Sequence, residues 1–237
     1  VTAGVQGGDW SIAPKNSYFG IIDTAGLRRK SKVEDSIEHY SNLRAEMAVD
    51  RADVCVILID ATVGFTEQDS KVAGIAHEAG KGCIIAVNKW DVADQEQKDR
   101  IKREIARKLA FLDFAKFHYI SALQGKGVGD LFASIDQAYA AAMIKIPTPK
   151  LTRALQMALE RQQPPLSGRV RPKMRYAHQG GSNPPVVIIH GNALDQVPAT
   201  YWRYLEHSFM KVFKLQGTPL RIQFVTAKNP FADKDKK

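Results

Sequence analysis

The stretch Cys83–Asp91, CIIAVNKWD, decides the fold. Its first part is a continuous apolar run, which is typical of a strand buried on both faces of a parallel sheet. It ends in four residues, Asn88-Lys89-Trp90-Asp91, whose polar side chains can bind a ligand. In an open α/β sheet the ligand crevice lies at the carboxyl ends of the strands. The stretch therefore predicts a central strand with a ligand site at its end.

Short apolar runs and amphipathic segments alternate on both sides of this strand. Further strands are predicted at 18–23, 54–60 and 117–120. Helical apolar spacing occupies 66–79, 101–109 and 128–135, and the first of these begins with a capping-box pattern at Thr66. Strand–helix alternation predicts a doubly wound α/β domain, which we assign to residues 1–146.

The segment KIPTPK (145–150) marks a joint, after which the order of elements changes. A helix is expected before Pro164, strands at 173–178 and 186–191, a helix from about Pro198, and a last strand at 220–225. Helix–strand–strand–helix–strand predicts a small α+β domain with helices on one side of a sheet. We assign it to residues 147–237.

Charge is divided unequally between these parts. The chain has 237 residues and a formal net charge of +9. Residues 1–150 hold 20 basic and 20 acidic side chains, whereas residues 151–237 hold 14 basic and 5 acidic ones. This asymmetry predicts that the second domain contacts a polyanion. The alternative is a basic surface that only keeps the domain soluble.

Composition excludes several classes of protein. Hydrophobic residues make up 44% and charged residues 25%, which is ordinary for a globular chain and excludes disordered and collagen-like ones. No apolar run approaches the roughly 20 residues of a membrane helix, so no membrane partner is expected. The only cysteines, Cys55 and Cys83, lie in apolar runs. They are expected to be buried, reduced thiols of a cytoplasmic protein.

The tetrapeptide Asn88-Lys89-Trp90-Asp91 matches the guanine-reading pattern N-K-x-D. A carboxylate at Asp91 can accept hydrogen bonds from the N1–H and the exocyclic amine of guanine, a pair that adenine does not offer. The stem of Lys89 can pack on the base, and Asn88 can tie neighbouring loops together. Ser121-Ala122-Leu123, after the strand at 117–120, would back the base with a backbone N–H. A solvated turn at the strand end is the alternative.

Asp23-Thr24-Ala25-Gly26 follows the strand predicted at 18–23. In a nucleotide triphosphatase this position needs a carboxylate that holds Mg²⁺ through water, here Asp23, and a glycine N–H that reaches the γ-phosphate, here Gly26. Leu27 stands where many GTPases have a glutamine that orients water. Leucine cannot do so, and we assign no catalytic residue.

Together these segments closely resemble the EngA/Der family of bacterial ribosome-assembly GTPases. The resemblance is carried by DTAGLRRKSKV (23–33), NKWD (88–91), FLDFAKFHYISALQGKGV (111–128), GRVRPKMRYAHQGGSNPPVVIIHGN (168–192) and GTPLRIQF (217–224). It implies the second of that family's two GTPase domains, of the P-loop type and here expected to be incomplete at its N-terminus, followed by its C-terminal KH-like domain. It also implies GTP or GDP and Mg²⁺ as ligands, and the large ribosomal subunit and its rRNA as partners.

The sequence departs from this family at the phosphate-binding loop. No G-x-x-x-x-G-K-[ST] motif occurs, and this loop normally cradles the phosphates. We expect a parent protein that is a GTPase and a chain that is inactive without that loop. The alternative is a non-catalytic RNA- or protein-interaction fragment that keeps only the guanine-reading half of the site.

Candidate RNA-binding residues lie in the basic domain: Arg169, Arg171, Lys173, Arg175, Lys211 and Lys214. The first four occupy every second position of the chain, so Lys173 and Arg175 would share one face of a strand. Lys211 and Lys214 could instead compensate a helix dipole. No G-x-x-G clamp of an RNA-binding KH domain is found between helices, and no DNA specificity is expected. Met174, Tyr176, Trp202, Phe209 and Phe213 are expected in the core.

Overall fold

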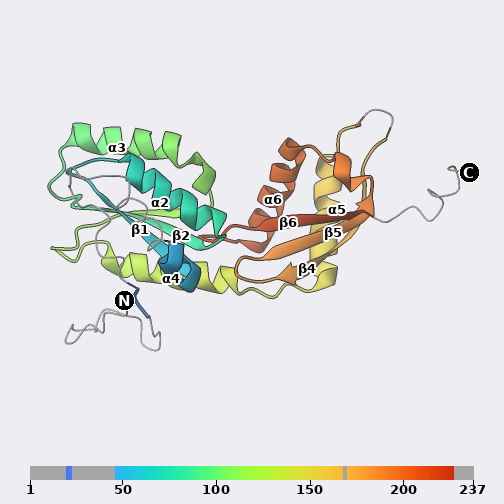
Figure 1. Cartoon of the computed structure of the whole chain (residues 1–237), viewed down its shortest axis with the longest axis horizontal. Helices are drawn as coiled ribbons and strands as arrows, with labels where there is room; N and C mark the ends of the chain where they lie inside the picture. The colour runs from blue at the N-terminus through green and yellow to red at the C-terminus, as the bar shows by residue number, and fades with distance from the viewer. Residues whose placement is uncertain (1–19, 23–45, 168–169, 227–237) are drawn as a thin grey trace, which may run out of the picture. The chain divides into compact units, whose positions relative to one another are not determined.

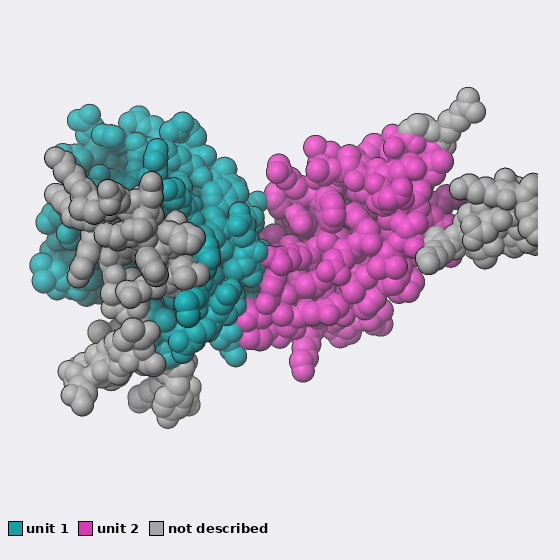
Figure 2. Space-filling model, viewed as in Figure 1, with its two compact units in different colours: residues 1–142, 216–219 teal, residues 143–215, 220–237 magenta. Residues whose placement is uncertain are grey.

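The computed structural model describes residues 20–22, 46–167 and 170–226. Most of the strand predicted at 18–23, the segment Asp23–Leu27 and the candidate RNA-binding residue Arg169 lie outside the described residues. The chain forms two compact units, one of residues 1–142 and 216–219, the other of residues 143–215 and 220–237 (Figure 2). The domain boundary at 146/147 stays a prediction. No helix in the described part has the length and apolar character needed to span a bilayer.

Unit 1 is built on a parallel sheet in the order β1-β2-β3. The strands are β1 (Val54–Asp60), β2 (Gly82–Asn88) and β3 (Lys116–Tyr119), close to the ranges predicted from the sequence. The central strand β2 is buried from residue 82 to residue 87, which explains its unbroken apolar run. In register, Asp60 lies opposite Asn88, so β1 and β2 end level with each other.

Helices cover both faces of this sheet, as a doubly wound domain requires. Figure 1 shows α2 (Glu67–Glu78) and α3 (Gln95–Lys108) on one side and α4 (Val128–Ala142) on the other. The capping box predicted at Thr66 is confirmed, because Thr66 Oγ1 accepts from Asp69 N and the Asp69 carboxylate accepts from Thr66 N. Asp94 and Gln97 form a second capping box at the start of α3.

Four residues from the last third of the chain, 216–219, belong to unit 1. Gly217 N donates to Phe114 O at 2.8 Å, and Gly217 O accepts from Cys83 N at 2.8 Å. Gly217 has φ +75°, and a Cβ there would lie 2.6 Å from the Cβ of Ala138 in α4. Only glycine fits this position, because both the backbone conformation and the close approach exclude a side chain.

Unit 2 has the predicted helix–strand–strand–helix–strand order. Its elements are α5 (Thr148–Arg161), β4 (Lys173–Gly181), β5 (Val186–Asn192), a short 3₁₀ turn η2 (Leu194–Gln196), α6 (Ala199–Phe213) and β6 (Arg221–Thr226). In the sheet β4-β5-β6, β4 is antiparallel and β6 parallel to β5. Leu151 and Leu155 of α5, Leu205 and Phe209 of α6, and Ile189 of β5 are buried and form its core.

The expectation that Tyr176 lies in the core is wrong. Its side chain is 44% exposed, whereas Met174 and Ala177 are buried. The register of β4 shifts between Met174 and Tyr176, which leaves Arg175 as the extra residue of a β-bulge. The bulge turns Tyr176 to the face opposite the helices. The same expectation is wrong for Trp202, which is 37% exposed and lies against Phe224 of β6.

Gly191 of β5 offers a test of how closely the strands of unit 2 pack. A Cβ at this position would lie 2.0 Å from the carbonyl oxygen of Lys173, which is backbone and cannot swing away. We expect Gly191→Ala to lower the free energy of unfolding of unit 2 by about 2 kcal/mol or more in urea titrations. The control is Gly181→Ala, whose Cβ would meet Val186 at an ordinary 3.5 Å. Equal unfolding midpoints for the two variants would contradict the described register.

Candidate functional site

The predicted site residues of unit 1 that the structure describes, in the segments 88–91 and 121–123, come together at one edge of the β1-β2-β3 sheet. Asn88 ends β2, and Ser121 follows the end of β3 by two residues. Parallel pairing joins Val87 to Tyr119, so the two following loops leave the sheet side by side. Trp90 N donates to Ile120 O at 3.1 Å, which holds these loops to each other.

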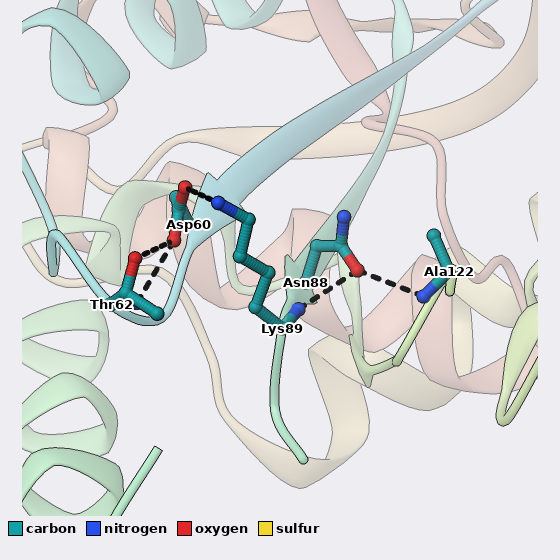
Figure 3. Close-up of polar contacts among 5 residues, drawn as sticks. All are labelled: Asp60, Thr62, Asn88, Lys89 and Ala122. Atoms are coloured by element: carbon teal, nitrogen blue, oxygen red, sulfur yellow. Dashed lines mark hydrogen bonds and ion pairs between the residues drawn. The ribbon is translucent and has the colours of Figure 1, made fainter. Parts of the chain in front are cut away.

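The side chain of Asn88 bridges these loops (Figure 3). Its Oδ1 accepts from Lys89 N at 2.8 Å and from Ala122 N at 2.9 Å. Both donors are backbone N–H groups that would otherwise need water or another acceptor. The asparagine therefore makes the tie between loops that its place in the N-K-x-D pattern predicts.

Lys89 lies in a strained part of the turn and reaches back to β1. Its φ is +61°, in the left-handed region that non-glycine residues seldom occupy. Its Nζ lies 2.9 Å from Asp60 Oδ2, while Asp60 Oδ1 accepts from Thr62 N at 2.9 Å and Thr62 Oγ1 at 2.6 Å (Figure 3). Partial burial raises the pKa of Asp60, but the Thr62 hydrogen bonds and Lys89 together outweigh it and lower the pKa to about 2. Asp60 is thus a carboxylate at neutral pH and orients the lysine.

Asp91 is exposed at the tip of the same turn. Its Oδ2 accepts from the side-chain amide of Gln124 at 3.0 Å. Gln124 N in turn donates to Ser121 Oγ at 3.3 Å, so the loop after β3 holds the amide in front of the carboxylate. The carboxylate is therefore already placed to accept an amide-type N–H donor.

Leu123 lies at the tip of the loop after β3. The loop is a tight turn closed by a bridge between Ser121 and Lys126, with Gly125 and Gly127 at φ +70° and +75°. Leu123 is 95% exposed. An isolated exposed leucine is ordinary on a surface, but here it stands beside the turn that carries Asp91.

The indole of Trp90 packs against side chains of β3 and α3. Its ring centroid lies 4.3 Å from that of Tyr119 in β3, and Lys98 and Lys102 of α3 hold their Nζ atoms 5.6 and 5.8 Å from its centroid. Cation–π attraction of this kind fixes the aromatic ring against α3. The indole thereby anchors the turn that presents Lys89 and Asp91.

Sequence reasoning missed Asp60 and Gln124. A signal for Asp60 exists, because it ends an apolar strand at the same sheet edge as Asn88. Nothing in the sequence singles out Gln124. The phosphate-side residues Asp23, Thr24, Ala25, Gly26 and Leu27 lie outside the described residues. Within the described ranges, no three His, Cys, Asp or Glu side chains gather as metal ligands do.

The candidate RNA-binding residues of unit 2 are exposed where the structure describes them: Arg171, Lys173, Arg175, Lys211 and Lys214. Arg171 donates to the side-chain oxygen of Gln163. Lys211 lies in the last turn of α6, and Lys214 caps that helix at φ +53°. The position of both lysines also suits the helix dipole, which is the alternative to a phosphate contact for this pair.

Comparison with known proteins identifies both parts of the chain. Residues 4–141 match the elongation factor Tu GTP binding domain, and residues 145–224 match the KH-domain-like domain of EngA bacterial GTPase enzymes, C-terminal. The chain is 63% identical over 219 residues to GTPase Der of Chromobacterium violaceum and 56% identical to GTPase Der of Neisseria meningitidis serogroup A. These alignments cover 92% of this chain but only 46% and 45% of the relatives.

A solved structure of Era in complex with MgGDPNP and part of 16S ribosomal RNA aligns with 85% of the chain at 19% identity and a TM-score of 0.40. The chain spans about half the length of the curated relatives it matches. It belongs to the family of elongation factor Tu-type GTP-binding domains and, by the pairing of that domain with the EngA-type KH-like domain, to the EngA/Der family.

Proposed function

We propose that this protein binds guanine nucleotides at the edge of the β1-β2-β3 sheet and is part of a GTPase. The observation that carries the proposal is the placement of Asp91. Its carboxylate stands beside two loops that Asn88 Oδ1 holds together, and it already accepts an N–H from Gln124. Guanine offers two such donors on one edge, so a guanine base can take the place of the Gln124 amide.

Three neighbouring groups suit a planar base at this position. Lys89 extends along the turn toward Asp60, which leaves its alkyl stem available to cover a ring. The loop Ser121–Leu123 stands at the same place, because Asn88 Oδ1 accepts from Ala122 N and holds the loop there. Leu123, 95% exposed, would bury apolar surface against the second face of the base. Together these groups make a slot whose bottom is the Asp91 carboxylate.

The phosphate half of the site rests on the resemblance to EngA/Der proteins. Asp23 is the residue that would hold Mg²⁺ through water, and the N–H of Gly26 would face the γ-phosphate. When bound, the metal neutralises phosphate charge. The sequence contains no G-x-x-x-x-G-K-[ST] motif. For these 237 residues alone, that observation favours the second candidate, a non-catalytic interaction module that retains base recognition.

Unit 2 is proposed to dock on RNA of the large ribosomal subunit, in the cytoplasm, under control of the nucleotide state. The support is electrostatic, since the whole net charge of +9 lies in residues 151–237. Phosphate contacts by lysine and arginine supply most of the affinity of such binding and make it depend on salt. Assembly of the ribosome is the role that the EngA/Der resemblance implies.

The base-reading role of Asp91 is tested by Asp91→Asn in the parent GTPase that the EngA/Der resemblance implies. The amide donates where the carboxylate accepted, so preference should move from guanine to xanthine nucleotides by at least about 100-fold, which competition binding measures. Asp99→Asn, on the exposed side of α3, removes the same charge and should leave preference unchanged. Unaltered discrimination in Asp91→Asn would remove this residue from base recognition.

RNA docking by unit 2 is tested by replacing Arg169, Arg171, Lys173 and Arg175 with glutamine together. Removing one cation from a phosphate lowers the slope of log affinity against log salt by about one, so the slope should flatten by up to about four. The matched control replaces four exposed cations of unit 1, namely Arg51, Lys71, Arg103 and Arg107. If both quadruple variants bind ribosomal RNA with the slope of the wild type, the basic segment only keeps the protein soluble.

A further inference from the structure

The β4-β5-β6 sheet of unit 2 has one face covered by helices and an opposite face, called the open face here, that no described helix or strand of unit 2 covers. On the covered face, Thr152 of α5 bonds to the backbone of Ala177, and Tyr204 of α6 bonds to Ala158 of α5. Ala177 and Ile189 are fully buried and so lie on the covered face, which Gly191 shares by alternation. The alternating positions, Tyr176, His178, Ile188 and His190, point the other way.

Three rings are stacked on this open face. Tyr176 and His190 are directly paired across β4 and β5, with centroids 4.5 Å apart and planes inclined by only 7°. His178, diagonal to that pair, lies 5.0 Å from His190 at 22°. Nε2 of His190 is shielded and has no hydrogen-bond partner among the described residues, so stacking holds this imidazole. Tyr176, at 44% exposure, presents the stack to solvent.

The open face continues as an apolar surface beside the rings. A Cβ on Gly180 would lie 2.4 Å from Cδ1 of Ile188, so Ile188 lies across the space that the glycine leaves. The row formed by Tyr176, His178, His190 and Ile188 is called the ring platform here. The bulge at Arg175 creates it, because without the extra residue Tyr176 would turn toward the helices.

The charge around the ring platform indicates which kind of molecule binds there. Strands β4, β5 and β6 contain no aspartate or glutamate, whereas Lys173, Arg175 and Arg221 are exposed on them. A positive surface that presents stacked rings is complementary to an anionic chain with planar groups. Single-stranded RNA is such a chain, since its unpaired bases can stack on aromatic side chains, while the bases of a duplex are already stacked inside it.

We propose that the ring platform binds single-stranded RNA by stacking one or two bases on Tyr176 and its neighbouring imidazoles, with Lys173 and Arg175 on the phosphates. The inference rests on the proposed RNA docking of unit 2. It adds the place where the RNA binds and the requirement that the RNA be single-stranded. Recognition by stacking is tolerant of sequence, because every base has a π-face.

The test measures binding of a fluorescein-labelled single-stranded RNA 12-mer to the full 237-residue chain by anisotropy. Tyr176→Ala should weaken binding about tenfold with an unchanged salt slope, because it removes a stacking surface and no charge. Tyr176→Phe keeps the ring and should bind within about twofold of the wild type. Tyr139→Ala, which removes a 46% exposed tyrosine from α4 of unit 1, is the matched control and should have no effect.

An abasic 12-mer of the same length and charge separates stacking from attraction to phosphates. It should bind the wild type about tenfold more weakly than the normal strand, and Tyr176→Ala should weaken it no further. A different result would be that RNA binds the wild type, that Tyr176→Ala binds it equally well and that the abasic strand binds as tightly as the normal one. That result overturns the platform proposal but not RNA docking by unit 2, and a protein would then be the candidate partner of this face. If no RNA binds the wild type, the docking proposal itself fails.

Discussion

The site of unit 1 depends on one oxygen atom, Oδ1 of Asn88. It accepts two backbone N–H groups, one from its own turn and one from the loop after β3. A shorter side chain would not reach Ala122, and an apolar one would leave both donors without an acceptor. Because β2 is buried on both faces, the position of this asparagine is set by the packing of the whole sheet. The position of Asn88 in turn sets the positions of Lys89, Asp91 and Leu123.

The two units divide the physical work between directional and non-directional interactions. In unit 1, hydrogen bonds at fixed angles present one carboxylate, and basic and acidic side chains balance over residues 1–150. In unit 2, positive charge accumulates with few carboxylates to offset it. Discrimination between similar small ligands requires the first arrangement, whereas attraction to a long polyanion requires the second. The charge boundary in the sequence agrees with the division that we propose between base reading in unit 1 and RNA docking in unit 2.

Most of the secondary structure could be predicted from the sequence because each element has an independent local signal. The apolar run of β2, the capping box at Thr66 and the apolar stripe of α6 each identify their element without knowledge of the rest. The site could be placed at a sheet edge for the same reason. Its proposed ligand follows from the N-K-x-D pattern, and the family comparison covers both parts of the chain.

What could not be predicted arises from contacts between segments that are distant in the sequence. The bulge at Arg175 depends on the register against β5, and alternation alone would place Tyr176 beside Met174 in the core. The partnership of Gln124 with Asp91 joins residues 33 positions apart through a loop conformation. The return of residues 216–219 to unit 1 leaves no pattern in the sequence, because a glycine and a proline there suggest only a turn.

Because residues 216–219 belong to unit 1, no single cut in the chain separates the two units. A fragment that ends at residue 142 would lack the backbone partners of Cys83 N and Phe114 O, and would expose the side of Ala138 that Gly217 covers. Conversely, β6 joins the sheet of unit 2 only after the chain has passed through unit 1. Most of unit 2 is therefore an insertion that both begins and ends in unit 1. The sheet of unit 1 completes its hydrogen bonding only when the polypeptide continues through unit 2 and returns.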